Sequence, residues 1–133
     1  MLSAKGAKKA KILSRLARKA AQLSADKSSL EIDCFDKDKN GVPKPSRDVF
    51  WSISHKQDRV AGVVSTQRIG IDIENIKPVS DRLSDKIVCP DEKILFEQED
   101  LDLVFFRVFT AKEAILKCAG DGMKGLSQVR VIR

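Results

Sequence analysis

Two separate stretches of the chain place acids beside strongly apolar residues. Asp72 and Glu74 alternate with isoleucines in "GIDIE", and Glu113 lies inside "FTAKEAILK". Charged side chains are kept out of such surroundings unless a cation or hydrogen bonds compensate them. The pattern therefore indicates acids that are held for a chemical purpose.

Asp72 and Glu74 are two residues apart in a segment with strand character, so both side chains are expected on the same face. Two carboxylates on one face repel each other unless a cation lies between them. A hard divalent ion such as Mg²⁺ prefers oxygen ligands and often retains water and substrate phosphates. Two acids on a solvated strand face would look the same, so this pair alone leaves both interpretations open.

The stretch "FTAKEAILK" has helical spacing. As a surface pair, Glu113 and Lys117 would stabilise the helix by about 0.2–0.5 kcal/mol. If Glu113 instead faces the strand, a third carboxylate joins Asp72 and Glu74. Lys117, one turn further on, would then reach phosphates that the metal holds.

The stretch "SISH" brings Ser54 and His55 to a predicted strand end, where both can donate to a phosphate oxygen. A lone histidine is also common as a structural residue. Each motif has an ordinary explanation, but the three together in this order are poorly explained by independent accidents.

The element at the start of the chain is predicted to be a basic helix over about residues 4–25. Its apolar positions recur at three- and four-residue steps, while the opposite face collects lysine and arginine. That face is either a solvated surface or an electropositive wall for phosphate or an acidic partner. The basic residues are Lys8, Lys11, Arg15, Arg18 and Lys19.

Short strands are predicted at residues 30–35, 49–54, 59–65 and 69–73, and the last three are close enough for an antiparallel meander. Gly70 inside the last of these indicates close approach by another backbone or a ligand. The sequence thus predicts a small antiparallel sheet.

The second half of the chain is predicted to be mainly helical. A short helix begins at Pro90 and runs through Leu95, and a long helix covers 101–119 and stops at Gly120. A final strand is expected at 129–132. The predicted class is α+β, with the small antiparallel sheet packed with a long helix.

The loop at 36–46 contains D-x-D-x-N-G, the start of a calcium-binding loop. The complete loop needs a bidentate acid six residues after the glycine, where this chain has Arg47. Calcium binding is therefore excluded.

Length and composition fit one domain, residues 1–133. Cys34, Cys89 and Cys118 are widely spaced and the single histidine is His55, so a zinc site is not expected, and a reducing cytoplasm is the expected location. No apolar run reaches the roughly 20 residues that cross a bilayer. The acid-free first 25 residues also have the composition of a transit peptide, an alternative that stays open.

The net charge of +6 predicts an anionic partner. Nucleic acid is disfavoured because aromatic residues make up 5% of the chain and tyrosine is absent. No membrane partner is expected.

The order of motifs resembles that of the 4′-phosphopantetheinyl transferases, in particular a short single-chain form of the Sfp-like type. The resemblance runs from about residue 10 to the C-terminus, and "GVPKP" is similar to the family's G-K-P turn with an insertion. The matching stretches are "GVPKP" (41–45), "WSISH" (51–55), "GIDIE" (70–74), "FTAKEAILK" (109–117) and "GDG" (120–122).

This resemblance implies a 4′-phosphopantetheinyl transferase-like fold, with the site motifs at 44–122. It also implies an enzyme that moves the phosphopantetheine arm of coenzyme A to a serine of an apo acyl or peptidyl carrier protein and releases 3′,5′-ADP. Asp72, Glu74 and Glu113 would hold Mg²⁺, or Mn²⁺, against the diphosphate. Glu113, or a water that the metal orients, would take the serine proton, and Lys117 would stabilise the leaving phosphate.

For coenzyme A, the resemblance implies contacts from Ser54, His55 and Lys117 to phosphate oxygens, and from Lys44 to the nucleotide end. Carrier proteins are acidic along their recognition helix, so the basic helix has a natural counterpart. Lys56 departs from the family, which commonly has serine there, and could add a phosphate contact.

The chain also departs from the family in length. Sfp-like monomers have two similar halves, and this sequence includes most of the first but stops soon after the "GDG". Shorter relatives assemble trimers with sites between subunits, so a homo-oligomer is expected. Holo-acyl-carrier-protein synthase activity in fatty acid biosynthesis is one expected role, although polyketide and nonribosomal peptide carriers stay open. The alternative is a coenzyme A- or nucleotide-binding relic without transfer activity.

Overall fold

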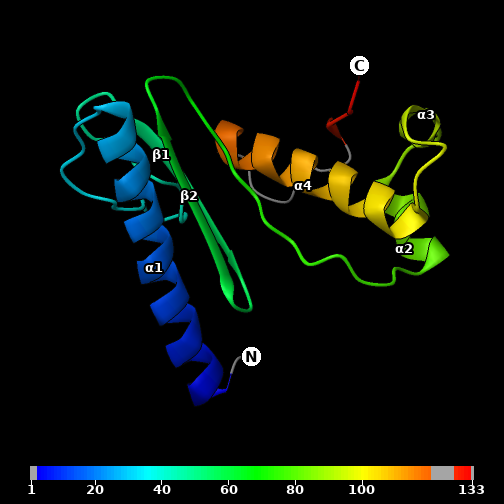
Figure 1. Cartoon of the computed structure of the whole chain (residues 1–133), viewed down its shortest axis with the longest axis horizontal. Helices are drawn as coiled ribbons and strands as arrows, with labels where there is room; N and C mark the ends of the chain where they lie inside the picture. The colour runs from blue at the N-terminus through cyan, green and yellow to red at the C-terminus, as the bar shows by residue number, and fades with distance from the viewer. Residues whose placement is uncertain (1–2, 121–127, 133) are drawn as a thin grey trace.

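The computed structural model describes residues 3–120 and 128–132, and within them the chain has the predicted α+β composition. An N-terminal helix packs on one face of a two-stranded sheet, and a long helix leads from the sheet towards two short helices (Figure 1). The elements are α1 (Ala4–Ser28), β1 (Phe50–Lys56), β2 (Arg59–Ser65), α2 (Asp81–Ile87), α3 (Pro90–Leu95) and α4 (Leu101–Ala119).

Helix α1 confirms the predicted basic helix and extends it by one turn. Ser3 caps its N-terminus by accepting from the backbone N–H of Gly6, and Ser29 ends it in the left-handed conformation. The helix buries a row of small residues at four-residue spacing against the hairpin. These residues are Ala17, Ala21 and Ala25, each 0% exposed.

The small residues let α1 lie unusually close to the sheet. A Cβ atom at Gly62 of β2 would fall 2.4 Å from both the carbonyl oxygen of Ala17 and the backbone nitrogen of Ala21. Only glycine fits there. The apolar side of the hairpin, with Trp51, Ile53 and Val64, completes this core.

Arg18 corrects the prediction for the basic face of α1. Its guanidinium lies over the Trp51 ring, 5.6 Å from the centroid, and its Nε donates to the carbonyl of Phe35 at 3.0 Å. Arg18 therefore fastens the loop after α1 to the core. The exposed part of the basic face is Lys8, Lys11, Arg15 and Lys19.

Strands β1 and β2 form an antiparallel hairpin in which Phe50 pairs with Ser65 and Lys56 with Arg59. This confirms the two predicted central strands, with β1 shifted by one or two residues. Because side chains alternate along a strand, Trp51 and Ile53 face α1 while Ser52 and Ser54 face the opposite side.

The third strand of the predicted meander, 69–73, is wrong. The backbone N–H groups of Ile71 and Ile73 donate to the hydroxyl oxygens of Ser52 and Ser54, at 3.1 and 3.2 Å. The serine hydroxyls of β1 thus accept the hydrogen bonds that backbone carbonyls of a neighbouring strand would accept in a sheet. The segment remains extended along the serine-bearing side of β1 without joining the sheet.

The predicted strands at 30–35 and 129–132 are also wrong, for a related reason. Side chains again form hydrogen bonds with the backbone groups that would otherwise pair with a neighbouring strand. The carbonyl of Phe35 accepts from Arg18, the N–H of Asp33 donates to Ser46 Oγ, and the N–H of Val131 donates to Glu92 Oε2.

Helix α4 has the predicted bounds. Asp100 caps its N-terminus by accepting from the N–H groups of residues 102 and 103, and Gly120 ends it with a φ of +77°. The predicted α3 is confirmed as well. Helix α2 was not predicted; its signal is Ser80, whose hydroxyl accepts from the N–H of Leu83 as an N-cap.

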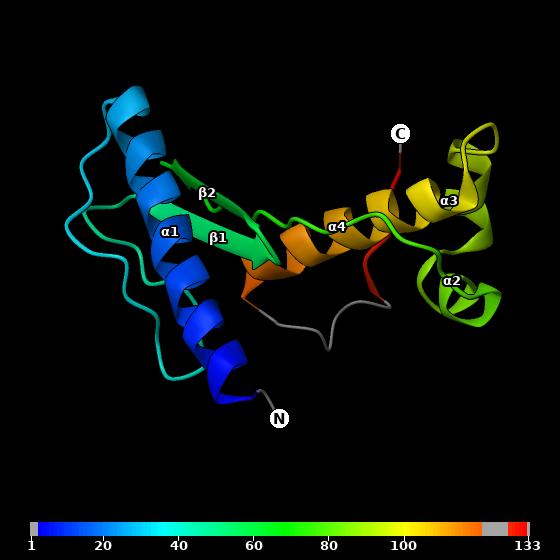
Figure 2. The same ribbon diagram turned by 60° about the horizontal axis from the view of Figure 1, so that its bottom comes forward.

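A second apolar core joins α4 to the short helices at the end of the molecule away from α1 (Figure 2). Phe105 contributes to it with an edge-on contact to Phe106 and a stacked contact to Phe109. Its buried members are Val88, Val104, Phe105, Phe106 and Val108.

An ion pair is buried inside this second core. Lys112 of α4 donates to Glu92 Oε1 of α3 at 2.7 Å, and the two side chains are each 1% exposed. Lys112 also donates to the carbonyl of Ile87 at 2.7 Å, while Glu92 accepts from the N–H groups of Cys89 and Val131. Every buried charge in the pair is thus hydrogen-bonded, as burial requires.

No helix in the described parts of the chain combines the length and the apolar character that a bilayer crossing would need.

Candidate functional site

Most of the predicted site residues line one pocket of about 300 Å³ on the serine-bearing side of β1. Its walls come from β1, the extended 71–74 segment, the 36–46 loop and the C-terminal half of α4. The polar residues are Lys37, Ser54, His55, Lys56, Asp72, Glu74, Glu113 and Lys117.

Gly70 brings the acidic segment against α4. A Cβ atom there would lie 1.8 Å from the carbonyl oxygen of Ala114 and 2.7 Å from the backbone nitrogen of Cys118. The predicted close approach of another backbone is confirmed. Glycine at this position is what allows the acids of the segment and the motif of α4 to share a pocket.

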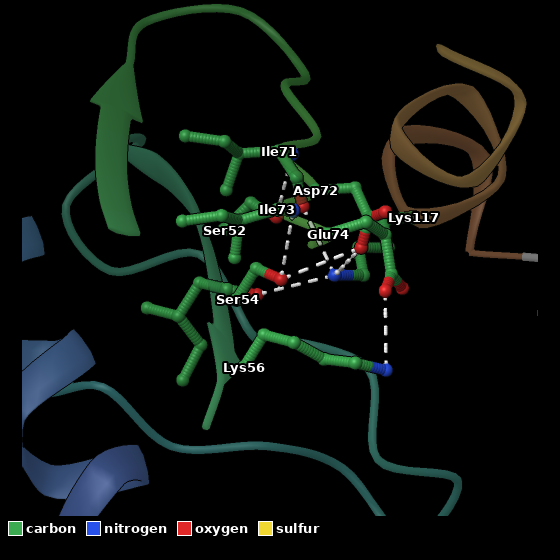
Figure 3. Close-up of polar contacts among 9 residues, drawn as sticks. Ser52, Ser54, Lys56, Ile71, Asp72, Ile73, Glu74 and Lys117 are labelled. Carbon is green, nitrogen blue, oxygen red and sulfur yellow. Dashed lines mark hydrogen bonds and ion pairs between the residues drawn. The ribbon is translucent and has the colours of Figure 1, made fainter. Parts of the chain in front are cut away.

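Asp72 lies at the centre of the polar contacts (Figure 3). Its Oδ1 accepts from Lys117 Nζ at 3.1 Å and from Ser54 Oγ at 3.3 Å, and the side chain is 7% exposed. Its Oδ2 is buried without a hydrogen-bond partner. A carboxylate with one satisfied and one orphaned oxygen is prepared to accept a further donor or a cation.

Lys117 connects α4 to the two other walls. Besides Asp72, its ammonium donates to the carbonyl of Ile71 at 3.0 Å and to that of Ile53 at 3.5 Å (Figure 3). The ion pair of Lys117 is therefore with Asp72 across the pocket. The alternative, a surface ion pair between Lys117 and Glu113 within the helix, is therefore wrong.

Glu113 carries the second orphaned oxygen, Oε1, which is buried without a hydrogen-bond partner. Its pKa is raised, first by burial and then by repulsion from Asp72 and Glu74, although Lys117 acts in the opposite sense. The three acids therefore act on one another electrostatically. This supports the alternative in which Glu113 joins Asp72 and Glu74.

Glu74 is held by a cation of the chain itself. Lys56 Nζ lies 3.1 Å from Glu74 Oε2, and the side chains are 43% and 15% exposed respectively (Figure 3). Lys56 comes from the end of β1, immediately after His55.

His55 lines the same pocket. Its pKa is lowered by burial and then by the positive charges of Lys37 and Lys117. Lys37, from the 36–46 loop, was missed as a site residue because nothing in the sequence distinguishes it from the other lysines of that loop. Its own pKa is lowered by removal from water and by the charges of Arg18 and Lys117.

Lys44 is the one predicted site residue that does not line this pocket. It lines a neighbouring pocket of about 410 Å³ together with Arg68 and the end of α4. Lys117 borders both pockets, so they adjoin. The backbone carbonyl of Lys44 accepts from the Trp51 indole at 2.8 Å, which fixes the loop over β1.

The donor chemistry of the acids fits a hard divalent cation such as Mg²⁺ or Mn²⁺. Asp72 Oδ2 and Glu113 Oε1 are buried oxygens without partners, and Glu74 supplies a third carboxylate. Within residues 3–120 and 128–132, no three or more His, Cys, Asp or Glu side chains already stand at metal-ligand spacing. Lysine ammonium groups contact two of the acids. Of the predicted "GDG" motif, residues 121 and 122 lie outside the described residues.

Comparison with known proteins places these motifs in context. Residues 68–133 match the profile of the 4′-phosphopantetheinyl transferase superfamily. The chain is 35% identical over 89 residues to the 4′-phosphopantetheinyl transferase HetI of Nostoc sp., covering 62% of this chain and 38% of that protein. It is 34% identical over 99 residues to the 4′-phosphopantetheinyl transferase psf-1 of Bacillus pumilus, covering 70% and 42%.

A third relative is the 4′-phosphopantetheinyl transferase gsp of Aneurinibacillus migulanus, 30% identical over 92 residues, with 67% of this chain and 39% of that protein covered. The chain thus spans about two fifths of the length of the curated relatives that it matches.

Proposed function

This chain belongs to the 4′-phosphopantetheinyl transferase superfamily, and on that basis we propose that it transfers the 4′-phosphopantetheine group of coenzyme A to a serine of an apo carrier protein. The serine oxygen forms a bond to the β-phosphorus of coenzyme A. The bond from that phosphorus to the bridging diphosphate oxygen breaks, and 3′,5′-ADP leaves with the bond's electron pair. The serine proton passes to a base, so atoms and charge balance.

Bound Mg²⁺ or Mn²⁺ would neutralise charge that develops on the diphosphate. Asp72, Glu74 and Glu113 are the residues that would hold the ion. Glu113 would also take the serine proton, directly or through a water, because an unassisted hydroxyl is a poor nucleophile. Its raised pKa fits a base that must hold a proton for part of the reaction.

The cationic side chains of the pocket fit the substrate's phosphates. Lys117 would stabilise the leaving phosphate, and His55 and Ser54 would donate to phosphate oxygens. Lys37 and Lys56 add positive charge to the same pocket. Lys44 borders the adjoining pocket, where the nucleotide end of coenzyme A would lie.

One observation carries this proposal. Acids from two separate motifs, Asp72 and Glu113, each present a buried oxygen without a partner in a pocket that Lys117 also lines. An orphaned buried carboxylate oxygen costs about 1–3 kcal/mol or more. A cation or donor bound in this pocket would satisfy both oxygens.

The exposed basic face of α1 supports an acidic carrier as the partner. Lys8, Lys11, Arg15 and Lys19 are all exposed there and no acid lies in the first 25 residues. We propose a cytoplasmic location and assembly into a homo-oligomer. Fatty-acid carriers, which would make the chain a holo-acyl-carrier-protein synthase, and polyketide or peptide carriers are compatible with this face.

The test is incubation of the purified chain with coenzyme A, Mg²⁺ and a panel of apo carriers, followed by intact-mass measurement of each carrier. We expect one carrier class to gain the phosphopantetheine mass. Asp72→Ala should abolish the gain while retaining a cooperative thermal transition. Turnover that persists in Asp72→Ala would refute the assignment of the metal ligands.

A coenzyme A-binding relic without transfer activity is the alternative. It is favoured by the lysine ammonium groups that contact Asp72 and Glu74 where a metal would be needed. A stoichiometric complex with coenzyme A, together with unmodified carriers in every reaction, would establish this alternative and exclude the transferase.

A further inference from the structure

The carboxylate of Glu74 is neutralised by a half-exposed residue of this chain, Lys56. Lys56 lies at the last position of β1, and its side chain is 43% exposed. Its Nζ reaches Glu74 Oε2 at 3.1 Å, and Glu74 is only 15% exposed. The pair therefore lies at the mouth of the pocket, with the acid inside and the lysine in contact with water.

The other charged groups of the pocket make this pair distinct. Asp72 is contacted by Lys117, whose ammonium is also bonded to two backbone carbonyls and thus belongs to the framework. Among the residues that the structure describes, the Lys56 side chain has one polar contact, to Glu74. Its long aliphatic stem can move the ammonium into water at little cost.

A divalent cation and Lys56 would compete for the same carboxylate. A metal that ligates Glu74 has to displace the ammonium or accept a positive charge beside it. Either outcome weakens metal binding. Displacing the ammonium costs its attraction to Glu74, and keeping it places two positive charges a few ångströms apart, where they repel.

We infer that Lys56 is a built-in counter-ion of Glu74 that lowers the affinity of this site for a divalent cation and is released into the pocket mouth when the cation binds. The inference deepens the proposed function, on which it rests for the identity of the ion. The released ammonium would remain within the pocket that Lys37 and His55 also line. Metal binding would thus make a cation available for an anionic ligand such as a diphosphate.

The experiment measures metal binding directly. The purified chain is titrated with Mn²⁺ at about 0.1 M ionic strength, where the Debye length is roughly 10 Å, and free Mn²⁺ is followed by its paramagnetic resonance spectrum. Lys56→Gln should bind Mn²⁺ about three- to tenfold more tightly than the wild type, the range for one unit charge acting over a few ångströms near water. Lys56→Arg keeps the charge and should bind like the wild type.

Lys93→Gln is the matched control. Lys93 forms a comparable exposed ion pair with Asp85, at 2.5 Å and with 40% exposure of the lysine, outside the pocket. It removes the same charge from the chain but should leave Mn²⁺ affinity within about twofold, because exposed charges more than a Debye length of roughly 10 Å apart are screened.

The gain in Lys56→Gln should shrink when the titration is repeated in high salt. Equal affinities of Lys56→Gln and Lys93→Gln would overturn the inference, and so would weaker binding by Lys56→Gln. A gain that high salt leaves unchanged would overturn it too, because the cause would then not be charge.

The inference and the proposed function fail in different ways. Absence of Mn²⁺ binding in both wild type and Lys56→Gln overturns the inference and removes the metal from the proposed function. Tighter binding by Lys56→Gln together with unmodified carriers would uphold the inference and overturn the transferase.

Discussion

Replacing Lys112 by methionine should be among the most destabilising single changes in this chain. Lys112 is 1% exposed and supplies the only charge that contacts Glu92 within the described residues. Methionine retains the length of the side chain but removes the ammonium. Glu92 would then keep a buried negative charge with only two backbone donors, and the carbonyl of Ile87 would lose its bond to Lys112.

The expected loss in free energy of unfolding is about 3–5 kcal/mol, the range for removing one partner of a buried pair. Small domains have a total stability of about 5–15 kcal/mol. For a chain of this length, each kcal/mol lowers the melting temperature by roughly 3–5 °C. Lys112→Met should therefore melt about 10–20 °C below the wild type.

Urea unfolding followed by circular dichroism measures the loss, with calorimetry for the melting temperature. Lys93→Met is the control, because its exposed ion pair with Asp85 should contribute at most about 1 kcal/mol. The double variant Lys112→Met with Glu92→Leu should recover most of the loss, since an apolar pair of similar volume often replaces a buried ion pair without cost.

A loss below about 1 kcal/mol in Lys112→Met would refute the reasoning, because a buried carboxylate cannot stay charged that cheaply without its partner. No recovery in the double variant would show that the loss comes from packing rather than from the uncompensated charge.

Three further predictions concern the pKa of Glu92, the close approach at Gly70 and the unpaired carboxylate of Glu113. Burial acts to raise the pKa of Glu92, but the hydrogen bonds from Lys112 and from two backbone N–H groups outweigh burial, so the pKa is lowered. The stability that ionised Glu92 contributes is therefore fully present above the pKa of a glutamate in the unfolded chain, about 4.3. It is lost as the pH falls through the lower pKa of the folded state. When urea unfolding is measured at a series of acidic pH values, the difference in free energy of unfolding between wild type and Lys112→Met should become smaller below about pH 4.3. A difference that stays constant with pH would contradict this. Gly70→Ala places a Cβ 1.8 Å from the Ala114 carbonyl oxygen, so it should cost about 1–3 kcal/mol or more and lower transfer activity; wild-type melting and activity would contradict the close approach. Glu113→Gln removes a carboxylate whose pKa is raised by burial and neighbouring acids. Without metal at pH 7 it should therefore raise the melting temperature, and with metal present it should abolish transfer. A lower melting temperature would contradict the unpaired state of this acid.

The motifs alone were sufficient to predict that six side chains from three stretches lie together. Ser54, His55, Asp72, Glu74, Glu113 and Lys117 were all expected from residue type and spacing, and all line one pocket. Their roles in metal and substrate binding stay predictions.

Helices α1, α3 and α4 and the central hairpin were also predicted from the sequence, because their signals are local. Gly120 ends α4 in the left-handed conformation where glycine was expected to stop it. The turn between β1 and β2 brings two neighbouring apolar runs together without help from distant residues.

The strands at 30–35, 69–73 and 129–132 could not be predicted correctly, because their backbone partners are side chains from remote positions. No local pattern indicates that Ser52 and Ser54 accept the N–H groups of Ile71 and Ile73. The burial of Glu92 depends in the same way on α3, α4 and Val131 meeting in space.

By itself, then, the sequence determined which chemical groups are available, where α3 and α4 begin and end, and that another backbone or a ligand comes close at Gly70. Only the tertiary structure decided how the charges are paired: Lys117 with Asp72, Lys56 with Glu74, and Lys112 with Glu92. The physical reason is that a charge is stabilised by whatever lies within a few ångströms of it, and those neighbours are 45, 18 and 20 residues away along the chain.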